Sequence, residues 1–225
     1  MVKLKIDSRT YTIDGNPTID QWMDLMRWDF EAPPHWPHII KRITDLPMPT
    51  IEEMTPEQQH LAVTMIAHSL TQRIEIPLPN FGKLNFGQFV DMEYYLAMGT
   101  HKSMRQILET LKIKVDGTQE ALWATEVYIK WRNNIYKQYS ALFGLDDTYE
   151  VDEPQQNKTP QQVAKEWYRI LVDLANDDLL AIEEVTNKGV KEVLNFMAVR
   201  KERQLEELRK QTQQKRQYDL QRRSR

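Results

Sequence analysis

The first thirteen residues alternate between apolar and polar side chains on either side of a short polar turn. Residues 2–6 place an apolar side chain at every second position, residues 7–9 are Asp, Ser and Arg, and residues 10–13 are Thr, Tyr, Thr and Ile. A period of two is typical of a half-exposed strand, and two such runs around a turn predict a β-hairpin.

Most of the remaining chain repeats apolar residues at intervals of three and four, which predicts amphipathic helices. Three of these helices are expected to begin at a threonine that is followed three residues later by glutamine, the pattern of a capping box: Thr18, Thr55 and Thr159. The apolar repeats place helical segments at 19–26, 36–43, 55–73, 86–98 with a stop at Gly99, 104–111, 118–143, 160–174 and from 190 onward. A short apolar segment at 179–182 leads to Gly189. Residues 74–78 are apolar and bounded by proline, which indicates an edge strand or an extended crossing.

The longest predicted helix before residue 145 runs from Thr118 to Phe143 and is closed by Gly144. Its apolar stripe advances in steps of four, and its tryptophans are expected in the core: Trp123, Val127, Trp131, Ile135 and Tyr139. A stripe of about six turns is typical of the central helix of a bundle. The predicted fold is therefore mainly α with an α+β character, in which the N-terminal β-hairpin packs on a helical bundle.

A change of composition divides the chain. Residues 145–160 have the sequence LDDTYEVDEPQQNKTP, which contains five acids and two prolines and is typical of a linker. We therefore expect a hairpin-and-bundle domain at 1–144, an acidic linker at 145–160, and a C-terminal helical region at 161–225.

Charge is distributed unevenly along the 225 residues, although the formal net charge is only −3. Residues 200–225 hold ten Lys or Arg and four acids, a net charge of +6, so the preceding 199 residues carry −9. The apolar stripe of the last helix thins beyond Met197 just where this basic composition begins. We therefore predict a long basic helix that projects from the body and favours an acidic partner.

Enzyme chemistry is not predicted. The sequence lacks a phosphate-binding glycine loop, GxGxxG, GxSxG and any cysteine, so no catalytic residue, metal ligand or cofactor is assigned. His35 and His38 stand three residues apart, but Pro37 lies between them and ordinary surface histidines are favoured over a metal site. Without an apolar run of about 20 residues or a signal-like N-terminus, we expect no membrane association and a cytoplasmic location.

The basic helix is the candidate binding element. The candidate partner-contact residues are Leu205, Leu208, Arg209, Lys210, Arg216, Tyr218, Arg222 and Arg223. Nucleic-acid binding would use the cations as phosphate contacts, but stacking surfaces usually interleave several aromatic rings and this segment has one. A protein-binding or simply solvated helix is therefore favoured over nucleic acid.

Four strings resemble proteins from the structural gene clusters of tailed bacteriophages. They are MVKLKIDSRTYTIDGNPTIDQWMDLMRWDF, KLNFGQFVDMEYYLAMG, QVAKEWYRILVDLANDDLLAIEEVTNKGVKEVLNFMAVRKER and QKRQYDLQRR. Together they cover most of the chain. The proteins that they resemble are tail assembly chaperones or related tail and baseplate components.

The resemblance implies a non-enzymatic role in tail morphogenesis, in the host cytoplasm. An assembly chaperone or adaptor would bind the tape-measure helix, tail tube subunits or baseplate subunits. Two alternatives stay open: a permanent structural virion component, such as a hub, tail or connector protein, and a nucleic-acid-associated protein that acts through the basic helix. Self-association, stoichiometry, the exposed apolar faces and a frameshifted form are not decided by the sequence.

Overall fold

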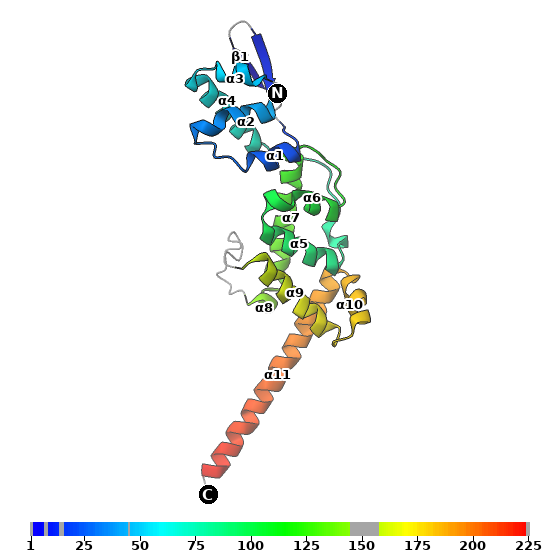
Figure 1. Ribbon diagram of the computed structural model, residues 1–225. Coiled ribbons are helices and arrows are strands. Elements are labelled where there is room, and N and C mark those ends of the chain that lie inside the picture. Colours follow the sequence, from blue (N-terminus) through cyan, green and yellow to red (C-terminus); the bar gives the residue numbers. More distant parts are fainter. Residues whose placement is uncertain (1, 7–8, 14–15, 45, 145–157, 224–225) are drawn as a thin grey trace. The chain divides into compact units, whose positions relative to one another are not determined.

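The computed structural model describes residues 2–6, 9–13, 16–44, 46–144 and 158–223 (Figure 1). Within these ranges, side chains are described for residue 10 and for 16–44, 46–144 and 158–216. The chain divides into two compact units, one made of residues 1–79, 91–129 and 159–163 and the other of 80–90, 130–158 and 164–225. Each unit is described by itself below.

Helices dominate both units. The first unit contains α1 (Ile19–Leu25), α2 (Trp36–Ile43), α3 (Met48–Glu52), α4 (Pro56–Thr71), α6 (Thr100–Thr110) and the short helix η1 (Pro33–His35). The second contains α8 (Ser140–Phe143), α10 (Leu179–Thr186), α11 (Val190–Arg223) and the short helix η2 (Phe81–Lys83). The remaining helices contribute residues to both units: α5 (Phe86–Met98), α7 (Thr118–Gln138) and α9 (Pro160–Leu174).

The predicted α+β class is wrong, and the fold belongs to the all-α class. Two short strands, β1 (Val2–Ile6) and β2 (Arg9–Ile13), pair with each other as an antiparallel ribbon in which Leu4 lies opposite Tyr11. Among the described residues they form no larger sheet. A ribbon of two strands is too small to supply a packing layer, whereas the described cores come from helices and the segments that join them. The predicted packing of a β-hairpin on a helical bundle is therefore wrong.

Helix starts follow the local pattern of the sequence. Thr18 and Thr55 each form the predicted capping box with the glutamine three residues later. Thr159 does the same before α9, since its hydroxyl accepts from the Gln162 amide at 3.3 Å and the glutamine side chain accepts from the Thr159 amide at 2.7 Å. A fourth reciprocal cap joins Asn85 to the third residue of α5. These caps satisfy amide groups that a helix leaves unpaired at its start.

Among the described residues, two hydrophobic clusters lie in the core of the first unit. One lies among α1 to α4 and consists of Leu25, Trp36, Ile39, Ile40, Ile43, Leu46, Ile51, Met54, Ala62, Val63 and Ile66. The other lies among α1, α6 and α7 and consists of Ile19, Trp22, Met104, Leu108, Ala121 and Ala124. Residues 74–78 run as an extended crossing outside any described strand, and Ile76 and Leu78 pack against this second cluster.

A close approach of the chain fixes the start of α7 in the first unit. The amides of Ile19 and Thr118 donate to carbonyl groups across the junction at 2.9 and 2.8 Å. The side chain of Asn16 accepts from the Gln119 amide at 2.9 Å and donates to the Glu120 carboxylate at 2.6 Å. Gly117 lies against the side-chain amide of Asn16, because a Cβ atom at residue 117 would overlap the Asn16 side chain. The absence of a side chain at residue 117 therefore permits the junction.

The predicted continuous helix over 118–143 is interrupted at Tyr139. This residue has φ −114° and ψ 33°, so α7 ends at Gln138 and the short α8 begins at Ser140. Gly144 then ends α8 with the left-handed φ of 66°, as expected for the predicted stop.

The buried face at the start of α7 differs from the predicted stripe. Trp123, Val127 and Trp131 are only half-buried, whereas Ile135 and Tyr139 are buried as expected. The fully buried side chains of the first three turns are Thr118, Ala121, Ala124, Thr125 and Tyr128. Small residues of α7 allow close helix packing in the second cluster, to which Trp123, Val127 and Trp131 do not belong.

The core of the second unit is an aromatic cluster around Phe89, whose side chain is fully buried. The centre of its ring lies 5.6 Å from that of Trp167 in α9 and 6.3 Å from that of Trp131 in α7, both in edge-to-face geometry. Phe86 and Tyr136 lie 6.2 and 6.4 Å from the same ring. Such arrangements suit the charge distribution of aromatic rings. Residues from α5, α7 and α9 thereby form the aromatic core of this unit.

Candidate interaction surface on helix α11

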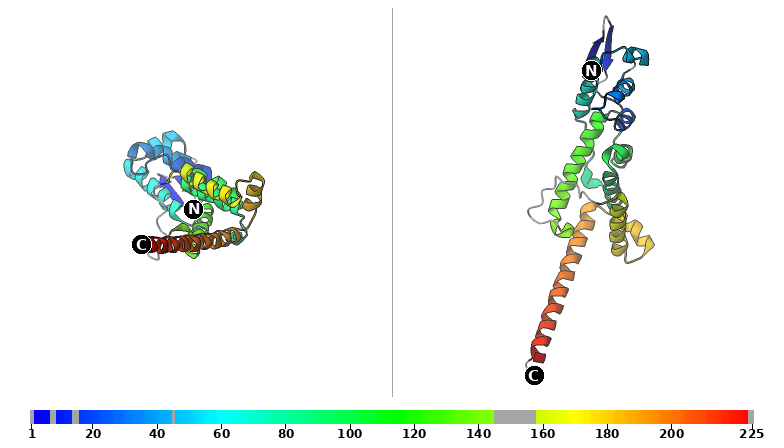
Figure 2. Two further views of the ribbon diagram at one scale, coloured as in Figure 1. Left: turned by 90° about the horizontal axis from the view of Figure 1, so that it is seen from below. Right: turned by 60° about the vertical axis from the view of Figure 1, so that its left-hand side comes forward.

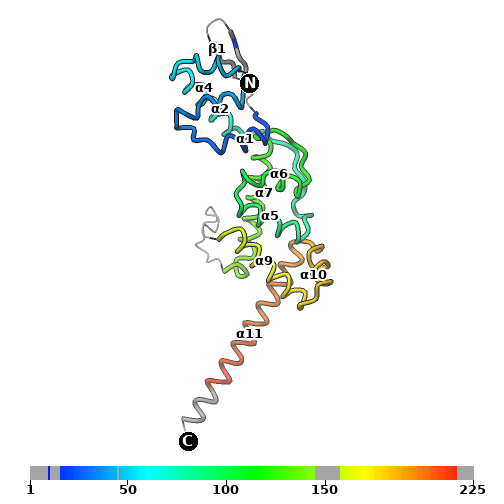
Figure 3. The backbone as a smooth tube through the Cα atoms, viewed as in Figure 1, coloured from blue at the N-terminus to red at the C-terminus, as the bar shows by residue number. Residues whose placement is uncertain are grey.

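The sequence of α11 explains why it remains helical far beyond its buried start. Val190–Arg223 contains neither glycine nor proline and is rich in Leu, Glu, Gln, Lys and Arg, which have high helix propensity. Figures 1 and 2 show its C-terminal half running out as a single helix beyond the other helices of its unit. The course of the backbone from α9 through α10 into α11 is traced in Figure 3.

Buried apolar residues and main-chain hydrogen bonds fix the start of α11. Val190, Val193 and Leu194 are at most 5% exposed. The Phe86 amide donates to the Lys188 carbonyl at 2.7 Å, immediately before the helix. These contacts place the first turn against the start of α5.

Polar contacts hold the next two turns. The Tyr139 hydroxyl donates to the Asn195 side-chain oxygen at 2.8 Å, and burial raises the pKa of this phenol. Arg200 donates to the main-chain carbonyl of Asp173 at 2.9 Å and pairs with its carboxylate at 3.2 Å. Lys201 donates to the carbonyl groups of residues 141 and 142 at the end of α8. A cation at a helix C-terminus is favourable, so Lys201 also complements the α8 dipole.

Beyond Lys201 the helix is open. Every described side chain from residue 202 to residue 216 is exposed, including Leu205 at 46% and Leu208 at 59%. With 3.6 residues per turn, both leucines lie within about 60° of the side of α11 that Val190 and Leu194 bury at its base. The apolar stripe of α11 therefore continues beyond the part of the helix that packs against the rest of its unit.

Basic side chains lie beside Leu208 and beyond it, whereas the exposed acids Glu202, Glu206 and Glu207 lie around Leu205. Residues 208–216 contain four cations, at 209, 210, 215 and 216, and no acid. Arg209 and Arg216 are exposed and lie next to the leucine stripe on the helix circumference. We call the surface formed by Leu205, Leu208, Arg209 and Arg216 the distal face.

The predicted contact residues lie on different sides of α11. Leu205, Leu208, Arg209 and Arg216 share one side of α11, whereas Lys210 lies roughly on the opposite side. Tyr218, Arg222 and Arg223 belong to the helix, and their side chains lie outside the described residues. The assignment of all eight to a partner contact stays a prediction.

A second exposed apolar surface lies on α10, a helix that begins in the short apolar segment at 179–182. Leu179 is 76% exposed and Leu180 is 79% exposed. Both stand on one side of the helix with the exposed acids Glu183 and Glu184, whereas Ile182 and Val185 on the other side are half-buried. The sequence signal for this exposure was a pair of adjacent leucines between two pairs of acids. Adjacent residues on a helix point in different directions, so both cannot face the centre of the same packing contact.

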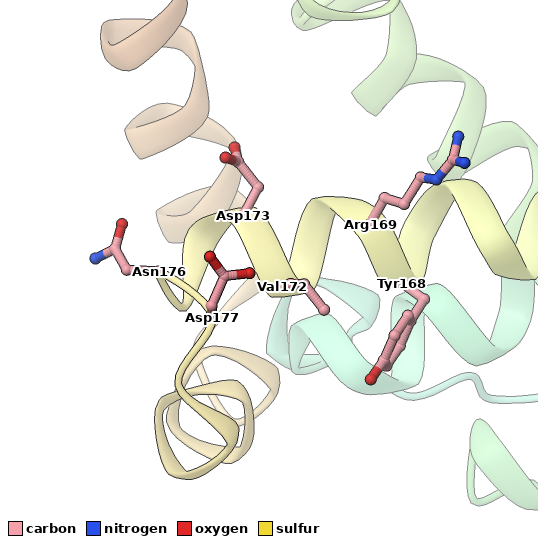
Figure 4. A pocket seen from close by; sticks show the side chains of 6 residues that line it. All are labelled: Tyr168, Arg169, Val172, Asp173, Asn176 and Asp177. Carbon is pink, nitrogen blue, oxygen red and sulfur yellow. The ribbon is translucent and has the colours of Figure 1, made fainter.

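A shallow hollow of about 420 Å³ lies at the C-terminal end of α9. In Figure 4, Tyr168, Arg169 and Val172 follow one another along α9, and Asn176 and Asp177 occupy the turn after it. Both turn residues have positive φ angles, 52° and 62°. The Asp173 carboxylate at its edge already pairs with Arg200, and Tyr168 and Arg169 point in opposite directions (Figure 4). The hollow thus offers no convergent set of catalytic groups.

The histidines considered as metal ligands have other neighbours. The His35 ring accepts a hydrogen bond from the Asp29 amide at 3.0 Å, and the His38 ring stacks on Trp28 at 6.1 Å. Within the described ranges, His, Asp and Glu form no group of three that could hold a metal ion. No helix among the described residues is long and apolar enough to cross a membrane.

Comparison with known proteins adds no relative to these observations. The chain matches no family model, no curated protein and no solved structure.

Proposed function

We propose that this chain is a non-enzymatic binding protein that presents the distal face of α11 to an acidic, amphipathic helix of a partner. We further propose that it serves phage tail morphogenesis, as an assembly chaperone or adaptor for the tape-measure protein, tail tube subunits or baseplate subunits. The phage setting is supported by the sequence resemblance, and the binding mode is supported by the geometry of α11.

The observation that supports this proposal most directly is the continuation of an apolar stripe onto an uncovered helix. Leu205 and Leu208 extend the side that is buried at the base, yet about half of each side chain is exposed. Helix-on-helix recognition uses apolar anchors at spacings of three and four. Arg209 and Arg216 would attract an acidic partner and set its register, because charges at the edge of an interface mainly affect encounter rate and specificity.

The anchoring of α11 suits such a role. Asn195, Arg200 and Lys201 of α11 form hydrogen bonds with Tyr139, with α9 and with α8, and these bonds fix the base of the helix. A binding helix held in one conformation loses less conformational entropy on association than a segment that must first fold.

Co-expression tests the proposal. The full chain is produced with the tape-measure protein and, separately, with the tail tube subunit of the same phage, and the amount of partner recovered with it is measured. We expect Leu205→Ser/Leu208→Ser to lower recovery by about tenfold. Val199→Ser is the matched control, since Val199 is 47% exposed and lies nine residues before Leu208, on the opposite side of α11. Equal loss in both variants, or unchanged recovery in the double variant, contradicts the binding mode.

Two further measurements separate the alternative roles. Stoichiometric amounts of the chain in purified virions would favour a permanent structural component over a transient chaperone. Salt-dependent binding of short single-stranded or duplex DNA by the full chain, lost on deletion of residues 202–225, would favour nucleic acid as the partner.

A further inference from the structure

We propose that the α10 face, formed by Leu179, Leu180, Glu183 and Glu184, binds the distal face of α11 in a second copy of this chain. This inference concerns self-association of the chain alone, so it holds or fails independently of the proposed phage partner.

The two faces match in chemistry. Each has two exposed leucines next to two exposed charged residues, acidic on α10 and basic on α11. Residues 173–187 contain five acids and no cation, whereas residues 208–216 contain four cations and no acid. A complementary interface places the apolar residues of two surfaces against each other and opposite charges at their borders.

The α10 leucines are unusually open. Their exposed fractions of 76% and 79% leave most of both side chains in water. A rotation of α10 about its axis could bury them. The register is held by Asp178, whose carboxylate accepts from the Leu180 amide at 2.9 Å and caps the helix. Ile182 and Val185 occupy the inward side instead. A contiguous exposed apolar surface with a charged rim is typical of an interaction site.

Distance along α11 favours a second copy over the chain's own helix. Helix α10 ends at Thr186, four residues before α11 begins. At a rise of about 1.5 Å per residue, Leu205 lies roughly 22 Å and Arg216 roughly 39 Å from the first residue of α11. Because α11 is a straight helix anchored at Val190, its distal face lies away from α10 of the same chain. Another molecule can supply the missing face.

The contact joins two different surfaces, so it can close reciprocally in a dimer or continue along a chain of subunits. Four leucines and their charged borders form an interface smaller than the ~1,200 Å² of stable complexes, so one contact is transient. The same distal face is offered to the partner proposed above, so partner binding and self-association exclude each other.

Sedimentation velocity of the full chain tests the inference, at concentrations from about 10 μM to 1 mM, which suit a small interface. We expect reversible association that weakens about tenfold in Leu179→Ser/Leu180→Ser and equally in Leu205→Ser/Leu208→Ser. Leu61→Ser is the matched control, because Leu61 is 54% exposed on α4. Circular dichroism and thermal melting establish that each variant is folded.

Mixing provides the decisive measurement. The variant that lacks the α10 leucines keeps its distal face, and the variant that lacks the α11 leucines keeps its α10 face. An equimolar mixture should therefore associate more strongly than either variant does alone. Self-association of the α10 variant as strong as that of the unaltered chain would instead indicate an α11–α11 contact and overturn the proposal, as would a mixture that stays monomeric.

Charge reversal tests the same pairing without altering apolar area. Glu183→Lys/Glu184→Lys and Arg209→Glu/Arg216→Glu should each weaken association, and the combined variant should recover it. Glu52→Lys/Glu53→Lys, an exposed acidic pair in the first unit, is the matched control. Failure of the combined variant to recover association, with its parents impaired, contradicts the proposed pairing of the two faces.

Discussion

Replacing Phe89 with alanine tests the aromatic cluster that joins α5, α7 and α9. The ring is fully buried and lies within 6.4 Å of four other aromatic rings, measured between ring centres. Loss of its burial costs about 2–3 kcal/mol, and a cavity that the rigid neighbours cannot fill adds up to about 2 kcal/mol. We therefore expect the free energy of unfolding to fall by about 4 kcal/mol. That loss is a large part of the ~5–15 kcal/mol typical of a whole domain.

Urea denaturation followed by far-ultraviolet circular dichroism measures this loss. Phe196→Ala is the matched control, because it removes the same ring from a site on α11 that is 59% exposed, and its effect should stay within about 0.5 kcal/mol. Phe89→Leu keeps most of the volume and should cost less than Phe89→Ala. A loss below about 1.5 kcal/mol for Phe89→Ala, with an unchanged dependence on urea, would refute the central place of this ring.

Two further substitutions probe specific junctions. Gly117→Ala should destabilise the first unit by about 1–3 kcal/mol in urea denaturation, because the new Cβ displaces the Asn16 amide from its hydrogen bonds; an unchanged midpoint would contradict this. Tyr139→Phe should cost about 1 kcal/mol through loss of the bond to Asn195. Because burial raises the folded-state pKa of Tyr139, its contribution is complete below the unfolded pKa and is lost as pH rises through the folded pKa. The stability difference between the two proteins should therefore shrink at alkaline pH; a constant difference would be inconsistent with this reasoning.

Helix starts were predictable from sequence because a cap is a local interaction. The boxes at Thr18, Thr55 and Thr159 each involve residues three positions apart, so no distant contact is needed to form them. The equivalent box at Asn85 was not predicted, although asparagine followed three residues later by glutamine is an equally local signal. Glycine stops at Gly99 and Gly144 were predictable for the same reason, since both have the positive φ that glycine favours.

The choice of buried face was not predictable, since several faces of α7 are apolar. Periodicity favoured Trp123 and Val127, but the second cluster of the first unit buries Ala121 and Ala124 instead. Which apolar residues face inward depends on the shape of the neighbouring helices, and small residues permit the closer approach. The interruption at Tyr139 likewise depends on packing, because its hydroxyl bonds to α11, more than fifty residues away.

Residue order along the chain was enough to predict helix starts and stops, the opposed charges of the body and the basic segment, and the candidate residues of α11. Tertiary packing was needed to establish the all-α class, the exposure of Leu179 and Leu180, and the residue after which the apolar stripe of α11 is exposed. Capping and charge are properties of neighbours in sequence, whereas burial is a property of neighbours in space. An apolar stripe has the same pattern whether it is buried or exposed, so the two binding faces became visible only when the packing around α10 and α11 was known.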